Sequence, residues 1–248
     1  MESVRNRPLR ALRALRELAR DPDDLPKVFE IVDSIPGRSP RRVLARMRAT
    51  ESGRRILVTR PNLSARLADR AALFALPAGT LGHEYAAFAE RAGITPQGIV
   101  DASLAGSIDD PDEPEDLRFS GERLRDSHDL WHVVTGYGTD VAGEVALLAF
   151  SYAQTRHPGI AAICGFAYLH FLPPLNELMR DAHRRGKAAA WLPAVVWEDL
   201  LARPLAEVRE ALGVGPAPAY TPIPTEVLRG ATLLDRIRAR NAYLAGAA

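Results

Sequence analysis

Four residues of this chain have side chains suited to binding a metal ion. They are His128, Asp129, His132 and Glu144. Histidines four residues apart lie on the same face of a helix, one turn apart. Glu144 follows His132 by twelve residues, so it can return from a second helix to complete the site. The spacing therefore predicts a metal centre with these four residues as ligands, and at a site with open positions the same residues would be the catalytic groups.

The donor types narrow the choice of metal without deciding it. Two imidazoles and two carboxylates suit zinc, iron, manganese or cobalt equally well. The absence of cysteine ligands favours a site with open positions, which allows catalysis, over a purely structural zinc site. Asp129 lies about 100° around the helix from His128. It can therefore bind the metal from one side or accept a hydrogen bond that orients a ligand histidine.

The helices that carry these residues are expected at 118–135 and 141–155. Between them, Asp140 or Thr139 can cap the second helix. This places Glu144 near the first turn of the second helix. Two antiparallel helices can then converge on one ion.

The whole chain has a helical pattern of apolar residues, and no alternating strand pattern stands out. We therefore expect an all-α fold, with one helical domain at 1–214 and a Pro-rich linker with a terminal helix at 215–248. Gly93, Gly136 and Gly213 are expected just after helix ends. The expected helices are 8–20, 24–34, 39–50, 63–75, 80–92, 118–135, 141–155, 159–172, 174–184, 191–201, 204–212 and 226–244.

Composition excludes several classes of protein. The 32 basic and 31 acidic residues nearly balance, which argues against a nucleic-acid-binding protein. The single Cys164 excludes an internal disulfide and a cysteine metal cluster, and it is expected as a small apolar core residue. No charged stretch followed by an apolar segment and a cleavage site resembles a secretion signal, so a cytoplasmic location is expected.

Two segments bear on membrane contact. The apolar run from Ile160 to Leu172 is thirteen residues long, shorter than the roughly 20 residues that a bilayer span needs. Residues 1–20 contain six arginines and two glutamates, a net charge of +4, with leucines at helical spacing. This helix either packs on the core or makes peripheral contact with anionic lipid on the inner face of the cell membrane.

The metal motif also resembles a known family. Arg123 to His132, followed by Gly143-Glu144, is similar to the signature of the Coq4 family of coenzyme Q (ubiquinone) biosynthesis proteins. That signature has a His-Asp pair, a second histidine three residues on, and a glutamate after an eleven-residue gap. Similarity covers about residues 10–214 and includes three further segments: Gly53-Arg54-Arg55-Ile56-Leu57 with Arg60-Pro61, Leu76-Pro77 through Phe88, and Trp197-Glu198 through Leu212.

The resemblance implies a zinc ion and a reaction at C1 of a polyprenylated hydroxybenzoate. There the carboxyl carbon is lost, and in an oxidative form of the reaction a hydroxyl group replaces it, so the activity would be that of a carbon–carbon lyase. A polyprenylated quinone precursor or another isoprenoid lipid is the expected partner, together with other ubiquinone-biosynthesis proteins and a second copy of the chain in a homodimer.

Two other functions remain open from the sequence. One is a non-catalytic scaffold that binds lipid and organises a quinone-biosynthesis complex. The other is a metal phosphohydrolase of HD type, but that class needs a further upstream His and a downstream Asp, and the spacing fits it poorly.

Further residues are weaker candidates. Arg123 and Arg125 precede His128 by about one turn, so they either bind a substrate carboxylate or form a surface pair. Small residues in 141–152 and 159–172 either let helices pack closely or leave a lipid cavity. Four further side chains are candidates for the site but are also explained as ordinary core or surface residues: His83, Tyr152, Gln154 and His170.

Overall fold

The computed structural model describes the chain except for residues 1–5, 109, 171–172, 228–234, 236–237 and 239–248. In this described part every regular element is helical, and the only β-type pairing is an isolated bridge between Thr80 and Pro204. The predicted all-α fold is therefore confirmed. The helix expected at 226–244 and the side chain of His170 lie outside what the structure describes, apart from Thr225–Val227 and isolated residues.

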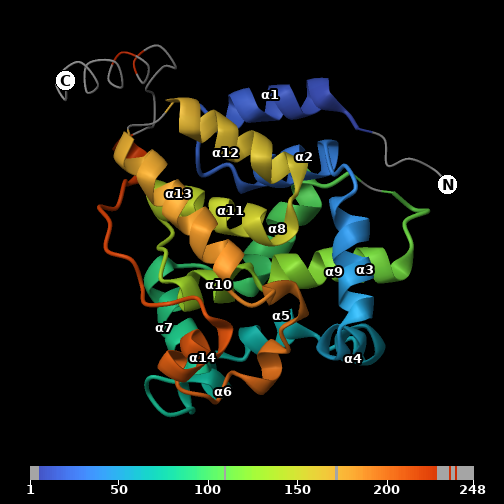
Figure 1. The fold of residues 1–248 in the computed structure, drawn as a ribbon, viewed down its shortest axis with the longest axis vertical. Helices are drawn as coiled ribbons and strands as arrows, with labels where there is room; N and C mark the ends of the chain where they lie inside the picture. Colours follow the sequence, from blue (N-terminus) through green and yellow to red (C-terminus); the bar gives the residue numbers. More distant parts are fainter. Residues whose placement is uncertain (1–5, 109, 171–172, 228–234, 236–237, 239–248) are drawn as a thin grey trace.

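The helices follow one another closely along the chain (Figure 1). In order they are α1 (Pro8–Leu18), α2 (Leu25–Ser34), α3 (Ser39–Ala49), α4 (Glu51–Thr59), α5 (Leu63–Ala68), α6 (Arg70–Phe74), α7 (Leu81–Ala92), α8 (Pro96–Gly106), α9 (Glu115–Asp126), α10 (His128–Thr135), α11 (Val141–Thr155), α12 (Pro158–His170), α13 (Pro173–Ala188), the 3₁₀ turns η1 (Leu192–Ala194) and η2 (Trp197–Asp199), α14 (Leu205–Leu212) and the 3₁₀ turn η3 (Thr225–Val227).

Some predicted helices differ from the structure. Helices α4 and α8 were not predicted, although Thr50 and Thr95 cap them by accepting hydrogen bonds from Gly53 and Gly98. The single helix expected at 191–201 is wrong, because that segment forms two short 3₁₀ turns. The helix expected at 118–135 is divided at Ser127 into α9 and α10.

Helix α11 lies near the centre of the main core. Figure 1 shows it surrounded by α10, α12 and α13, and α13 is the helix that it contacts most extensively. Its buried residues include Val145, Ala146, Leu147 and Phe150, and they pack with buried residues of α7, α10 and α13 in one apolar cluster. Because α11 is held on several sides, a side chain in its first turn has a fixed position.

Segments that are distant in sequence meet beside α7. The amides of Leu81 and Gly82 donate to the carbonyl oxygens of Arg203 and Leu201, at 2.9 and 2.8 Å. A β carbon on Gly82 would lie 3.1 Å from that Leu201 oxygen, so the close approach favours glycine. Two of the segments with family resemblance are therefore in direct contact.

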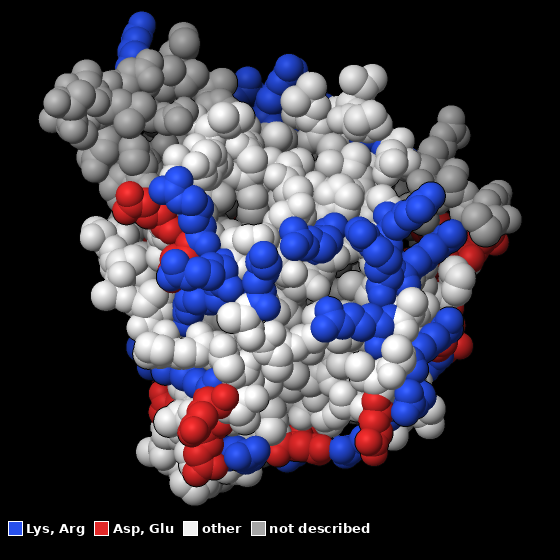
Figure 2. Space-filling model, in the orientation of Figure 1, with Lys and Arg blue, Asp and Glu red and all other residues white. Residues whose placement is uncertain are grey.

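The surface is unevenly charged. On the face in Figure 2, lysine and arginine side chains surround an uncharged central area, and acidic side chains gather near the lower edge. Helix α12 contains no charged residue. No helix in the described residues is both long and apolar enough to cross a bilayer.

Candidate metal centre

Three of the four predicted ligands meet at one point. His128 begins α10, His132 lies one turn later, and Glu144 lies in the first turn of α11. Each offers one ligand atom, and these atoms all lie within 4.8 Å of one another. Glu144 Oε1 is 3.3 Å from His132 Nε2, and Glu144 Oε2 is 4.0 Å from His128 Nε2. The expected convergence of two helices on one point is confirmed.

Local signals at the loop between the two helices produce this meeting. Gly136 ends α10 in the left-handed conformation at φ 81°, which a residue with a side chain rarely adopts. Asp140 caps α11, with its carboxylate accepting hydrogen bonds from the amides of Ala142 and Gly143. Of the two caps proposed from the sequence, Asp140 is the one used. The loop therefore brings Glu144 back over α10.

The geometry of His132 fits a metal ligand. Its Nδ1 lies 3.1 Å from the carbonyl oxygen of Tyr137, so Nδ1 carries the proton in the neutral ring. The lone pair is then on Nε2, which is buried and has no hydrogen-bond partner. The ring also stacks on Phe88, with centroids 5.7 Å apart. A buried acceptor left without a donor is costly, and a bound cation would satisfy it.

Asp129 lies beside His128. Its Oδ1 is 3.3 Å from His128 Nδ1, and its side chain is largely buried. Asp129 is not among the three residues whose ligand atoms converge in the described structure. This position supports the orienting role, in which the carboxylate fixes the ring of His128 and leaves Nε2 for the metal.

The charges of His132 and Glu144 depend on each other. Burial alone would raise the pKa of Glu144, but the nearby His132 and His128 rings outweigh it and hold this pKa below its usual range. Burial likewise opposes the charge on His132, but the Glu144 carboxylate outweighs it and raises the pKa of His132. A divalent ion would displace the imidazole proton and take its place beside the carboxylate.

The centre is accessible from one side. The His132 side chain is only 1% exposed, whereas those of His128 and Glu144 are 26% and 38% exposed. Three protein ligands leave at least one position open on a four-coordinate ion. The arrangement can therefore bind a metal and still admit a substrate or water.

The two predicted substrate-binding arginines lie elsewhere. Arg123 is buried, and its guanidinium forms a bidentate ion pair with Glu198, with one N–O distance of 2.8 Å. Arg125 donates to Asp126 at 2.8 Å. Both line a pocket of about 490 Å³, and its lining includes none of the three converging ligands. Substrate binding by these arginines stays a prediction, and the pairing of Arg123 points to a structural role.

Other candidates contribute to packing. Gln154 is buried and bonds to Gly186 O at 2.6 Å, while Tyr152 stacks on His183. A β carbon on Gly143 would lie 2.2 Å from a backbone oxygen, and one on Gly159 would lie 2.7 Å from a backbone carbon. Close helix packing, one of the two interpretations of the small residues, is therefore confirmed at Gly159, which lies against Val32 of α2, whereas Gly143 lies against the loop residue Gly138.

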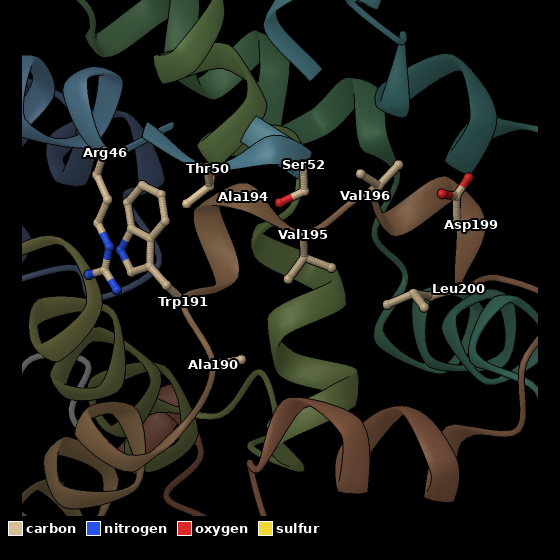
Figure 3. Close-up of a pocket in the computed structure, with 10 residues that line it drawn as sticks. All are labelled: Arg46, Thr50, Ser52, Ala190, Trp191, Ala194, Val195, Val196, Asp199 and Leu200. Carbon is tan, nitrogen blue, oxygen red and sulfur yellow. The ribbon is translucent and has the colours of Figure 1, made fainter. Parts of the chain in front are cut away.

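Cys164 and His83 also have ordinary surroundings. Burial raises the pKa of the Cys164 thiol to about 12, in agreement with an unreactive apolar residue. His83 makes an edge contact with Phe74. A second pocket, of about 420 Å³, lies between α3, α4 and the two 3₁₀ turns (Figure 3). Its lining includes Arg46, Trp191 and Asp199 and none of the residues predicted from the sequence.

Sequence reasoning missed three residues around the centre. Phe88 stacks on His132, Tyr137 supplies the carbonyl oxygen, and Tyr220 bonds to Asp140 through its hydroxyl at 2.8 Å. Tyr220 lies in the segment that was predicted to be an extended linker. An isolated aromatic residue in a Pro-rich segment was the available signal, because such a ring is commonly used to dock a segment on a domain.

Comparison with known proteins places this geometry in context. Residues 14–218 match the family model described as coenzyme Q (ubiquinone) biosynthesis protein Coq4. The mitochondrial ubiquinone biosynthesis protein COQ4 of Uncinocarpus reesii is 33% identical over 177 residues, which is 69% of this chain and 61% of that protein. The Pyricularia oryzae protein of the same name is 31% identical over 210 residues, which is 79% of this chain and 63% of that protein.

A solved structure shares the fold. A crystal structure of a candidate ubiquinone biosynthesis protein from Nostoc punctiforme matches with a TM-score of 0.62 and 24% identity, covering 84% of this chain and 97% of that one. The present chain spans about three fifths of the length of the curated relatives. With most of its length matched by the family model and a relative above 30% identity, the chain belongs to the Coq4 family of coenzyme Q (ubiquinone) biosynthesis proteins.

Proposed function

We propose that this chain acts in ubiquinone biosynthesis as a metal-dependent enzyme that removes the carboxyl group from C1 of a polyprenylated hydroxybenzoate. Family membership supports the pathway, since the relatives are named as ubiquinone biosynthesis proteins. The observation that carries the enzymatic part is the buried Nε2 of His132, which has no hydrogen-bond partner and lies 3.3 Å from Glu144.

His128, His132 and Glu144 would hold one divalent ion, and family resemblance favours zinc. When bound, the ion would act as a Lewis acid that polarises the substrate carboxylate or phenolate. Two neutral imidazoles and one carboxylate leave a divalent ion with a net charge of +1. Such a ligand set favours an anionic substrate, and a hydroxybenzoate carries the required negative charge.

The protein groups have separate roles in this proposal. The Tyr137 carbonyl keeps the His132 lone pair on Nε2, and Asp129 orients His128 in the same way. The partly exposed His128 and Glu144 leave the outer side of the centre open to the substrate. In the reaction, the bond between C1 and the carboxyl carbon breaks, carbon dioxide leaves, and the electron pair that remains on C1 takes up a proton. No oxidant is needed for this balance.

A variant of Glu144 tests the proposal. Glu144→Gln retains the size of the side chain but removes one negative charge from the ligand set. Introduced into a strain that lacks the protein, it should fail to restore ubiquinone, and a carboxylated polyprenyl precursor should accumulate in lipid extracts. The matched control is Glu90→Gln, because Glu90 is an exposed residue of α7. Restoration of ubiquinone by Glu144→Gln to the control level would contradict catalysis and favour the lipid-binding scaffold.

A further inference from the structure

The loop of residues 136–140 determines where two of the three ligands lie. Its Tyr137 carbonyl accepts the His132 Nδ1 proton, and its Asp140 caps the helix that carries Glu144. A shift of this loop would therefore move both the lone pair of His132 and the carboxylate of Glu144. Contacts that fix the position of this loop therefore also fix the positions of His132 and Glu144.

The segment after α14 holds this loop by direct hydrogen bonds. The Tyr220 hydroxyl donates to Asp140 Oδ2 at 2.8 Å and accepts from the Gly138 amide at 2.7 Å. The Ile223 amide donates to Asp140 Oδ1 at 2.9 Å, and the Ile223 oxygen accepts from the Val141 amide at 2.9 Å. Four hydrogen bonds thus join residues 220–223 to residues 138–141.

The start of the segment is fixed as well. The Arg185 guanidinium donates to Thr135 O at the end of α10 and to Val214 O and Pro216 O in the segment, each at 2.9 Å. A β carbon on Gly136 would lie 2.4 Å from the Ala217 side chain, so the two backbones are very close there. In Figure 1 this segment runs along the side of the helical domain.

The Tyr220 hydroxyl lies very close to the first turn of α11. A β carbon on Gly143 would lie 2.6 Å from this hydroxyl oxygen and 2.2 Å from Gly138 O. Gly143 directly precedes Glu144, so its lack of a side chain allows Tyr220 to reach the helix start. The Asp140 carboxylate accepts hydrogen bonds from both the Tyr220 hydroxyl and the Ile223 amide. The family match ends at residue 218, just before Tyr220.

We propose that Tyr220 is a positioning residue of the metal centre, which fixes His132 and Glu144 in their metal-binding arrangement by clamping Gly138 and Asp140. This inference rests on the metal centre of the proposed function. Groups that orient metal ligands without touching the ion typically change metal affinity by 10- to 100-fold when they are replaced. Tyr220 bonds to the loop residues Gly138 and Asp140 and not to a ligand side chain, so we expect its replacement to change metal affinity by about tenfold, the lower end of this range.

The experiment measures metal affinity rather than activity. Metal-free wild type, Tyr220→Phe and Tyr152→Phe are titrated with Co²⁺ in competition with a chelator, and the visible absorption of the cobalt reports the ligand geometry. Tyr152→Phe removes the same hydroxyl from a tyrosine of α11 that stacks on His183. The thermal melting of each metal-free protein is measured in parallel. We expect Tyr220→Phe to bind Co²⁺ about tenfold more weakly with an altered absorption spectrum, and Tyr152→Phe to match wild type.

The outcomes separate this inference from the proposed function. If wild type binds Co²⁺ and Tyr220→Phe has the same affinity and spectrum, the positioning role is contradicted while the metal centre stands. If Tyr220→Phe only lowers the melting temperature, its role is structural and the inference is again contradicted. If wild type binds no Co²⁺, the metal centre itself is contradicted and the positioning role with it.

Discussion

The Nδ1 atom of His132 is hydrogen-bonded to the carbonyl oxygen of Tyr137, five residues further along the chain, at 3.1 Å. This bond leaves Nε2 as the only nitrogen of the ring that can bind a cation. Nε2 faces Glu144, and the His132 side chain is only 1% exposed. The ring therefore has no alternative partner in solvent. The hydrogen bond between His132 and Tyr137 therefore orients Nε2 of His132 towards the metal centre.

We accordingly predict that purified protein carries about one divalent ion per chain. His132→Ala should lose most of this metal, because it removes the buried ligand, while His83→Ala should keep it, since His83 contacts Phe74 instead. Elemental analysis after gel filtration measures both. Equal metal content in the His132→Ala protein and wild type would contradict the site.

Much of the metal centre could be predicted from the sequence because its signals are local. The spacing of His128 and His132 requires only a helix, and Gly136 and Asp140 mark the two helix ends that bring Glu144 back. What could not be predicted depends on distant residues. Nothing near Tyr220 in the sequence points to Asp140, 80 residues earlier, and contacts of this kind appear only when the chain is folded.

The same distinction between local and distant contacts explains Arg123. Glu198, which pairs with the Arg123 guanidinium, lies 75 residues later in the sequence, so this partner could not be predicted, whereas the partner of Arg125 is its neighbour Asp126. Helix α8 was missed because its apolar residues have little one-sided pattern, so its Thr95 cap and Pro96 start were the only signals. The division at Ser127 was missed because the apolar pattern continues across it.

The Arg123–Glu198 pair yields a prediction on stability. Arg123→Ala should lower the free energy of unfolding by about 3 kcal/mol, because it leaves the partly buried Glu198 carboxylate without its partner. The matched control is Arg55→Ala, which breaks the neighbouring exposed pair with Asp199 and should lower the free energy of unfolding much less, because solvent screens that pair. Urea unfolding measures both. Equal small losses would show that Arg123 is not structural and would favour its role in binding substrate.

His157 predicts how stability depends on pH. Its ring is buried before α12, where Nδ1 accepts from the Gly159 amide at 3.1 Å, and burial, with Arg42 nearby, lowers its pKa to about 4. Above the ordinary histidine pKa of about 6.5 both states are neutral. As the pH falls from 6.5 towards 4, only the unfolded state gains a proton, so the free energy of unfolding should decrease by about 3 kcal/mol and then level off.

His157→Asn isolates this contribution. Asparagine can accept the same amide hydrogen bond at a helix start but does not titrate. Urea unfolding of both proteins at pH 7 and pH 4.5 gives the difference, in which the other titrating groups cancel. An equal loss of stability in the two proteins would show that His157 does not cause the pH dependence.

The last prediction concerns the membrane. Leu9 and Leu12 on α1 are 83% and 44% exposed, and Tyr168 and Leu169 of the uncharged α12 are 37% and 58% exposed. Both helices pack on α2 and lie near the top of Figure 1. Arginines of α1 lie beside these leucines, which is the arrangement of a helix that rests on anionic lipid. We therefore expect peripheral binding to vesicles that contain anionic lipid, weakened by high salt because the arginine contribution is screened.

Replacing both leucines tests which face makes contact. Leu9→Ser with Leu12→Ser should weaken vesicle binding by about tenfold or more, since each leucine would lose the favourable transfer of its side chain into the apolar phase. The control is Leu104→Ser on α8, a leucine that is 70% exposed on another helix. Co-sedimentation with vesicles measures binding, and unchanged melting temperatures show that the fold is intact.

If Leu104→Ser weakens binding as much as the α1 variant, or if the α1 variant binds like wild type, α1 is not the contacting element. In that case the packing of α1 on α2 through Ala14 and Leu18 would be the sole role that the structure supports for this helix.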